Sequence, residues 1–289
     1  MFRPALPVAL YAVALAALLS GCSTTPPSAP VFPEVQAFSA NRAGTATPRG
    51  WHPWIIHRGK TPTQYGLVQD PQTREVVVRA VAESAASGLK QRLDVDSQSR
   101  SVISWRWRVT QLIEAADNTD RHAEDSPVRL MLFFDGDRSK LPANELMKFE
   151  LAKMLTGQEP PYATLMYIWE NRQPVGEVIK SSHTGRVKMV VAGSGTDRLG
   201  QWKSFERNYA EDFKRAFGEA PGRLIGIGIL TDTDNTAARV EAYYGDIRLR
   251  PASLRSAGTT SPPSAPPESS HSASPRPTPV AVPAVAPLH

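Results

Sequence analysis

Two tryptophans and two arginines alternate in the segment Trp105-Arg106-Trp107-Arg108. In a β-strand successive side chains point to opposite faces, so both indoles share one face and both guanidiniums share the other. Two guanidinium forks side by side can grip a carboxylate or a phosphate. Alternatively, the Trp pair is core and the Arg pair is a solvated outer face that needs acidic partners. Nearby acids that could be those partners are Asp117, Asp120, Glu124 and Asp125.

Tyr167 and Trp169 also share one face of a predicted strand. If that face is a concave sheet surface, the two rings offer flat platforms on which sugar rings can stack. If it points inward, they are core aromatic residues. With Arg106, Arg108 and Asn171 they form the predicted ligand-binding face.

Asp232, Asp234 and Asn235 follow a predicted strand that contains Gly226 and Gly228, where another group can approach the backbone closely. Oxygen-rich loops of this kind can hold Ca²⁺. The full spacing of an EF-hand loop is absent, and Asp and Asn also form turns without any metal. A structural calcium is thus the one cofactor that the sequence suggests.

No catalytic residue is predicted. Gly193-Ser194-Gly195 lacks the spacing of a nucleophile elbow, and the histidines form no metal-binding pair. Two carboxylates that meet in the fold, such as Asp117 and Asp232, would still permit glycoside hydrolysis. Whether the protein is an enzyme is therefore left open, and the residues favour binding without catalysis.

The charges point to no nucleic-acid partner. The chain of 289 residues has 33 basic and 28 acidic side chains, and this small excess is spread along it rather than gathered in runs. A single cysteine excludes a disulfide framework and a metal site built from several cysteines.

That cysteine lies at the end of an apolar N-terminal segment. The apolar run 8–19 would rise only about 18 Å as a helix, too short to span a bilayer and typical of a signal peptide. Leu19-Ser20-Gly21-Cys22 resembles the lipobox of bacterial lipoproteins. The resemblance implies cleavage before Cys22, lipidation of its sulfur and attachment to the membrane. Ser23 then favours the outer membrane, with the protein facing the periplasm.

Composition divides the chain into four parts. Residues 1–21 are the predicted lipoprotein signal peptide, and 22–50 are predicted to be a flexible tether. Residues 51–250 can form one globular domain. Residues 251–289 are rich in proline, serine and alanine and contain no Phe, Trp or Tyr, which predicts a disordered tail.

Strands dominate the predicted domain. Segments rich in β-branched and aromatic residues lie at 75–82, 88–95, 101–109, 128–134, 163–169, 186–191, 223–230 and 238–244. Helices are predicted at 143–155 and 208–217, each followed by a glycine. In the first helix Met147, Leu151, Met154 and Leu155 share one stripe. These elements do not alternate as βαβ units, so we expect an antiparallel sandwich of two sheets with two short inserted helices.

Four motifs resemble the proteobacterial family called domain of unknown function 3047, over about residues 51–249. They are Ser104-Trp-Arg-Trp-Arg-Val109, Tyr167-Ile-Trp-Glu-Asn171, Thr231-Asp-Thr-Asp-Asn-Thr-Ala237 and Ala242-Tyr-Tyr-Gly-Asp-Ile247. The layout of strands is also similar to jelly-roll modules of the galactose-binding and carbohydrate-binding type. That second resemblance concerns the fold and assigns no ligand.

The sequence thus predicts an envelope lipoprotein with a jelly-roll-like β-sandwich that binds a glycan or another envelope polymer without catalysis. A lipoprotein that docks on another envelope protein is the first alternative. A glycoside-hydrolase-like enzyme is the second.

Overall fold

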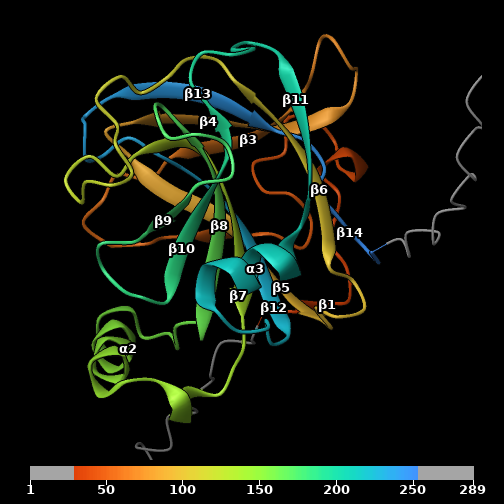
Figure 1. Cartoon of the computed structure of the whole chain (residues 1–289). Coiled ribbons are helices and arrows are strands. Elements are labelled where there is room, and N and C mark those ends of the chain that lie inside the picture. The colour runs from red at the N-terminus through yellow and green to blue at the C-terminus, as the bar shows by residue number, and fades with distance from the viewer. Residues whose placement is uncertain (1–28, 253–289) are drawn as a thin grey trace, which may run out of the picture. The chain divides into compact units, whose positions relative to one another are not determined.

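Two β-sheets packed face to face make up the domain in a computed structural model that describes residues 29–252 (Figure 1). The strands are mainly antiparallel, and two helices are inserted between them. The predicted jelly-roll-like sandwich is therefore confirmed. The predictions for residues 1–28, including lipidation of Cys22, and for residues 253–289 lie outside the described residues.

The larger sheet has eight strands in the order β1-β5-β12-β7-β8-β10-β9, with β2 also paired to β5. Two neighbouring pairs, β1 with β5 and β8 with β10, are parallel. Its strands are β1 (Val31–Phe32), β2 (His52–Trp54), β5 (Ala86–Val95), β7 (Ser126–Phe134), β8 (Ala163–Glu170), β9 (Val178–Lys180), β10 (Val187–Ser194) and β12 (Leu224–Asp232).

The smaller sheet has six strands in the order β11-β6-β13-β4-β3, with β14 also paired to β6. Its strands are β3 (Gln64–Gln69), β4 (Val76–Glu83), β6 (Val102–Val109), β11 (Trp202–Asn208), β13 (Arg239–Tyr244) and β14 (Arg248–Arg250). All eight predicted strands are present across the two sheets. The strands that the sequence did not predict are short or lie at sheet edges, as β3 and β11 do.

The core between the sheets is aromatic. Alternation along β6 places Trp105 and Trp107 inward, where both are at most 3% exposed. The ring of Trp105 lies 4.7 Å from that of Tyr167 on β8 and 5.1 Å from that of Phe205 on β11. Aromatic contacts at these spacings join the two sheets into one core.

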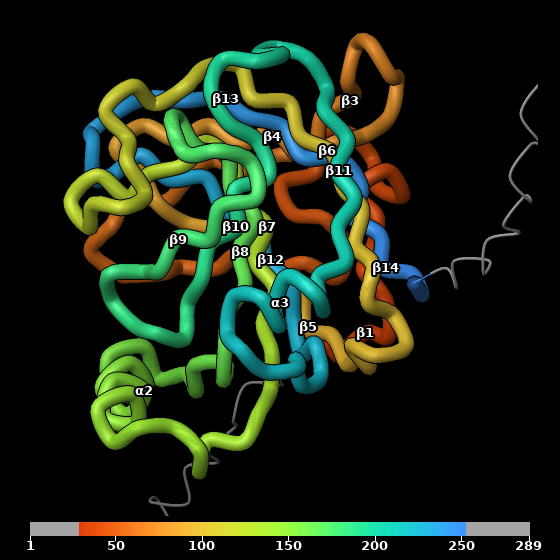
Figure 2. Tube along the Cα trace, in the orientation of Figure 1, coloured from red at the N-terminus to blue at the C-terminus, as the bar shows by residue number. Residues whose placement is uncertain are grey.

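Both helices form where predicted, because the chain supplies their ends. In α3 (Tyr209–Phe217) the side chain of Asn208 accepts hydrogen bonds from two backbone N–H groups of the first turn. In α2 (Ala143–Thr156) Pro142 precedes the first turn, and Gly157 ends the helix in the left-handed conformation with φ = 69°. Figure 2 shows α2 at one end of the sandwich, beyond the ends of the strands.

Residues 29–50 pack on the sandwich, although the sequence predicts a tether over 22–50. Strand β1 pairs with β5, and the ring of Phe38 packs 4.9 Å from that of Trp51 and is 1% exposed. Ser39 Oγ donates a 2.6 Å hydrogen bond to Asp246. Strand pairing, an aromatic contact and a hydrogen bond across 207 residues therefore hold this polar segment on the domain. Within the described residues, no helix is long and apolar enough to cross a bilayer.

Candidate functional site

The predicted Arg pair lies on the outer face of the six-stranded sheet, and acidic side chains already pair with it. Arg108 Nη1 lies 3.1 Å from Asp70 Oδ2, and its guanidinium stacks 3.9 Å from the ring centre of Tyr243. Arg106 pairs with Glu75 and stacks on the ring of Trp202. The partners are therefore Asp70 and Glu75 rather than the acids between 117 and 125. Both guanidiniums already have carboxylate partners, so this face does not provide the predicted anion clamp.

The same outer face contains a bidentate ion pair with a pH signature. Arg79 donates from Nε and Nη2 to the two carboxylate oxygens of Glu241, at 3.0 and 2.7 Å. These hydrogen bonds from Arg79, helped by one from Tyr243, hold the pKa of Glu241 at about 2. The carboxylate is thus stabilised in the folded state relative to the unfolded chain.

We expect this pair to contribute to stability above about pH 4.5, and to lose that contribution as pH falls toward 2. The free energy of unfolding should therefore fall less on acidification in Glu241→Gln than in the unmodified protein, by about 1 kcal/mol. This value is reduced for solvent screening because Arg79 is partly exposed. Urea unfolding at several pH values measures it. Glu83→Gln, at a pair with Arg239 that is exposed on both sides, is the control. Equal acid sensitivity of both variants would contradict the prediction.

Tyr167 and Trp169 point inward and are not surface platforms. They are 0% and 2% exposed. The Tyr167 hydroxyl donates a 2.8 Å hydrogen bond to Asp212, and Trp169 Nε1 donates one to the carbonyl of Gly195. Of the two alternatives for this pair, the core position is the one observed. The prediction that they belong to a ligand-binding face is wrong, because the inner face of β8 is covered by the second sheet.

Asn171 also has a structural role. Its side-chain amide donates to the carbonyls of Ile113 and Ala116, at 2.7 and 2.9 Å, and so fixes the loop after β6. Of the five predicted ligand-binding residues, Arg106 and Arg108 lie together on one outer face. Tyr167 and Trp169 lie in the core, and Asn171 ties a loop.

The predicted calcium residues Asp232 and Asp234 do come together, joined by Asp125. One carboxylate oxygen from each of the three residues lies within 4.8 Å of the other two. The side chain of Asn235 points elsewhere and donates to the carbonyl of Arg121. The set of side chains that meets therefore differs from the predicted one, with Asp125 in place of Asn235.

Two protein cations already pair with two of the three carboxylates in this cluster. Lys60 Nζ lies 2.6 Å from Asp234 Oδ2, and Arg129 Nε lies 3.1 Å from Asp232 Oδ1. Asp125 accepts hydrogen bonds from the N–H and the hydroxyl of Thr236, at 2.8 and 2.7 Å. A calcium ion would have to compete with Lys60 for Asp234.

We therefore expect the melting temperature to change by less than about 1 °C when calcium or a chelator is added. A calcium ion bound only to the folded state and present at 100 times its dissociation constant would add about 2.7 kcal/mol and raise the melting temperature by several degrees. The same measurement on Lys60→Met, in which Asp234 has lost its cation, gives the calcium response of the cluster without that competitor. A calcium-dependent rise in the unmodified protein would establish the metal site instead.

Burial raises the pKa of Asp232 to about 6, against the opposing effect of Arg129. The carboxylate is therefore mostly ionised at neutral pH but holds a proton more readily than an exposed aspartate. Since Asp232 is at the end of β12, its charge lies at the edge of a cleft on the outer face of the eight-stranded sheet.

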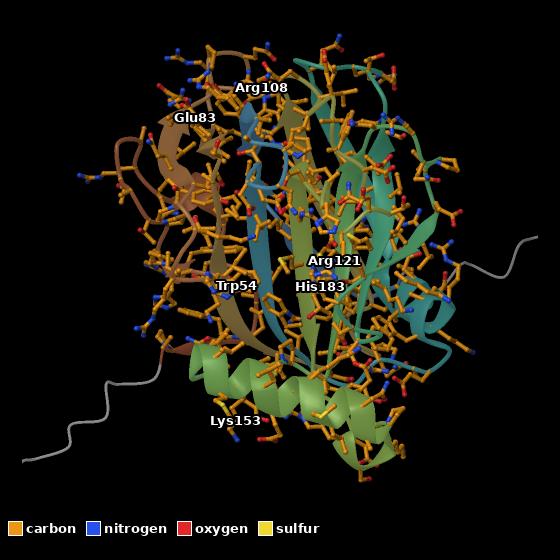
Figure 3. All side chains as sticks on the ribbon, turned by 90° about the vertical axis from the view of Figure 1, so that its left-hand side faces the viewer. Trp54, Glu83, Arg108, Arg121, Lys153 and His183 are labelled. Carbon is orange, nitrogen blue, oxygen red and sulfur yellow. The ribbon has the colours of Figure 1, made fainter. Side chains whose placement is uncertain are left out.

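A cleft of about 410 Å³ opens on the outer face of the eight-stranded sheet. Its floor consists of outward-facing residues of β7, β8 and β12, among them Met131, Phe133 and Met166. Figure 3 shows Trp54, Arg121 and His183 on this side of the molecule, above α2. The volume is within the range of small-molecule and cofactor sites.

Two aromatic rings define the apolar part of the cleft. Trp54 and Phe133 are half-buried, and their rings meet edge to face with centres 5.5 Å apart. Gly88 and Gly228 lie beneath them: a Cβ at Gly88 would lie 3.1 Å from the Trp54 indole, and one at Gly228 would lie 3.3 Å from the Phe133 ring. The rings therefore rest on the backbone of the sheet, and glycine is what allows this close approach.

Polar and charged side chains surround these rings. They come from loops and strand ends far apart in the sequence: Lys60, Arg121, Glu124, Arg129, His183, Asp232 and Asn235. Such an arrangement can stack one flat apolar face of a ligand and hydrogen-bond its edge. Sequence reasoning missed Trp54 and Phe133. The only signal for them was the glycine pair Gly226 and Gly228, which does indicate a close approach to β12.

Solved structures with a similar strand layout include enzymes and binding modules that act on saccharides. A β-1,2-glucanase from Parabacteroides distasonis is 11% identical with a TM-score of 0.36, and the match covers 73% of this chain and 24% of that chain. A tandem CBM22 domain of Xyn10C from Paenibacillus barcinonensis is 10% identical with a TM-score of 0.30, covering 81% and 50%. A CBM28 module specific for non-crystalline cellulose is 13% identical with a TM-score of 0.30, covering 77% and 96%.

These likenesses are too weak to assign a ligand to this chain, which spans about a quarter of the glucanase chain. No curated protein matches the sequence. Residues 49–248 match the family described as "Protein of unknown function (DUF3047)". That range covers most of the chain and includes all four motifs noted in the sequence, so the chain belongs to this family.

Proposed function

We propose that this protein is an envelope lipoprotein, anchored through Cys22, whose outer cleft binds a saccharide or another envelope polymer without catalysis. The observation that carries the proposal is the Trp54–Phe133 pair, half-exposed above a glycine floor and surrounded by polar side chains. A sugar ring combines an apolar C–H face with a rim of hydroxyl groups. The first can stack on the aromatic pair, and the second can hydrogen-bond to the rim.

Noncatalytic binding is favoured by the state of the carboxylates in the cleft. Glu124 and Asp232 both line it, so an acid–base pair for glycoside hydrolysis is the second candidate. Asp232 Oδ1, however, is 3.1 Å from Arg129 Nε and accepts from the N–H of Ser126 at 3.0 Å. The oxygen of Asp232 that the ion pair and the Ser126 N–H already occupy is therefore not free to deliver a proton to a ligand in the cleft. Release of reducing ends, abolished by Glu124→Gln, would favour the hydrolase instead.

The test is titration of the full chain with a panel of soluble envelope glycans by calorimetry. Trp54→Ala should weaken binding at least about tenfold, equivalent to 1.4 kcal/mol, because it removes the larger ring of the pair. The matched control is Trp202→Ala, which removes a half-buried indole from the outer face of the other sheet. Equal losses in both variants, or binding of no glycan by the unmodified protein, would contradict the proposal. If the unmodified protein binds no glycan, co-purification of a stoichiometric protein would favour docking on an envelope protein.

A further inference from the structure

Helix α2 presents an apolar stripe to solvent. Its four members are 53–80% exposed: Met147, Leu151, Met154 and Leu155. On a helix these positions share one face, since they are spaced by three, four, seven or eight residues. The opposite face holds the buried residues Glu145 and Phe149. The stripe predicts a helix in the sequence, and the sandwich leaves it uncovered.

The stripe is held in a fixed orientation. Glu145 accepts hydrogen bonds from the hydroxyl of Thr184 and from Gly185 N, the latter at 3.2 Å, so that the first turn of α2 is tied to the turn before β10. The guanidinium of Arg138 stacks 5.1 Å from the ring centre of Phe149. The side of α2 that faces the sandwich is therefore anchored, and the stripe must face away from it.

The described chain begins beside the end of this helix. On β5, Lys90 Nζ donates to Gln158 Oε1 at 2.8 Å, just after α2, and Arg92 Nη1 donates to the carbonyl of Ala29 at 3.1 Å. Lys90 and Arg92 are two residues apart on one strand, a rise of about 7 Å, and they point to the same side. Cys22 precedes Ala29 by only seven residues, which span at most about 25 Å when fully extended.

We propose that the apolar stripe of α2 docks into the surface of the phospholipid bilayer that holds Cys22. The inference rests on the lipid anchor of the proposed function. An acylated Cys22 keeps the bilayer within a short reach of the end of α2, which raises the effective concentration of lipid at the stripe. Amphipathic helices insert their apolar face at the boundary between headgroups and acyl chains in this way.

Charge has little part in this docking. The two lysines nearest the stripe are each paired with a glutamate at 2.9 Å, Lys148 with Glu145 and Lys153 with Glu159, and the exposed Glu150 lies between Met147 and Met154. Figure 3 shows Lys153 on the side of α2 that faces away from the strands. Because the cations are neutralised within the protein, docking should depend on apolar contact and persist at high salt.

The test uses the full acylated protein in vesicles of phosphatidylethanolamine with a minor share of phosphatidylglycerol. Acylation occupies the only native thiol, so Met154→Cys can take an environment-sensitive fluorophore. The control label is at Val175→Cys, which is also exposed and apolar but follows β8 at the end of that strand away from α2. We expect the label at 154 to shift to the blue and to be quenched by lipid-borne quenchers in both low and high salt. The label at 175 should do neither.

Three results would overturn the inference. The first is the same aqueous spectrum for both labels, and the second is loss of the shift at high salt. The third is a blue shift without vesicles in the unacylated Cys22→Ser protein, which would mean that another copy of the protein covers the stripe. The combined variant Met147→Ser, Leu151→Ser and Leu155→Ser should lose the shift at 154 while its melting temperature is retained. Glycan titration of the same samples tests the cleft separately, and mass spectrometry of Cys22 tests the anchor.

Discussion

Trp169→Ala is expected to lower the free energy of unfolding by about 3–5 kcal/mol and to leave saccharide affinity unchanged. The indole is 2% exposed, and its Nε1 donates to the Gly195 carbonyl at 3.0 Å. Its ring also fills the space over Gly193, where a Cβ would come within 2.4 Å of it. Truncation therefore leaves a cavity in the core and an unpaired carbonyl. Urea unfolding and glycan titration of the same variant measure both quantities.

Trp169→Phe separates packing from hydrogen bonding, because it keeps most of the ring and removes the donor. It should cost less than the alanine variant. Arg106→Ala is the surface comparison, and we expect at most about 1 kcal/mol from it, since its pair with Glu75 is partly exposed. If Trp169→Ala lost glycan affinity but kept its free energy of unfolding, Trp169 would be a ligand-binding residue and the core assignment would be wrong.

Arg129→Met should cost about 3–5 kcal/mol at neutral pH, because it leaves Asp232 buried without its cation. Arg129 is 3% exposed, and its Nη2 also donates to the Glu124 carbonyl at 2.8 Å. The carboxylate of Asp125 lies in the same cluster and adds repulsion. Removing the guanidinium therefore leaves two buried carboxylates together.

The pH dependence of that loss identifies its cause. Burial already places the pKa of Asp232 at about 6, above its unfolded value, so the native state takes up a proton as pH falls through 6. Loss of the guanidinium raises that pKa further, so folded Arg129→Met takes up its proton at a higher pH than the unmodified protein, and its deficit should shrink between about pH 7.5 and pH 5. Adding Asp232→Asn, which keeps an acceptor for the Ser126 N–H, should restore most of the stability at pH 7.5. A deficit that is constant with pH would assign the loss to packing.

The parts that the sequence determined are those set by neighbours along the chain. Strand patterning located eight strands, including the seven that have eight or more residues. Asn208 with Gly218 marked the ends of α3 because caps act on adjacent backbone groups. Alternation also grouped Trp105 with Trp107 and Arg106 with Arg108. The edge strand β11 was missed since charged residues interrupt its pattern, as Lys203 and Glu206 show.

Only the tertiary structure decided which face of each strand is covered. Alternation groups Tyr167 with Trp169, but whether the pair meets solvent or a second sheet depends on the packing of β8 against β6. Ion-pair partners are equally nonlocal: Arg129 lies 103 residues from Asp232. The cleft joins Trp54, Phe133 and His183 from three separate parts of the chain. Pairing between strands brings such residues together, and the periodicity of side chains along one strand does not predict which strands pair.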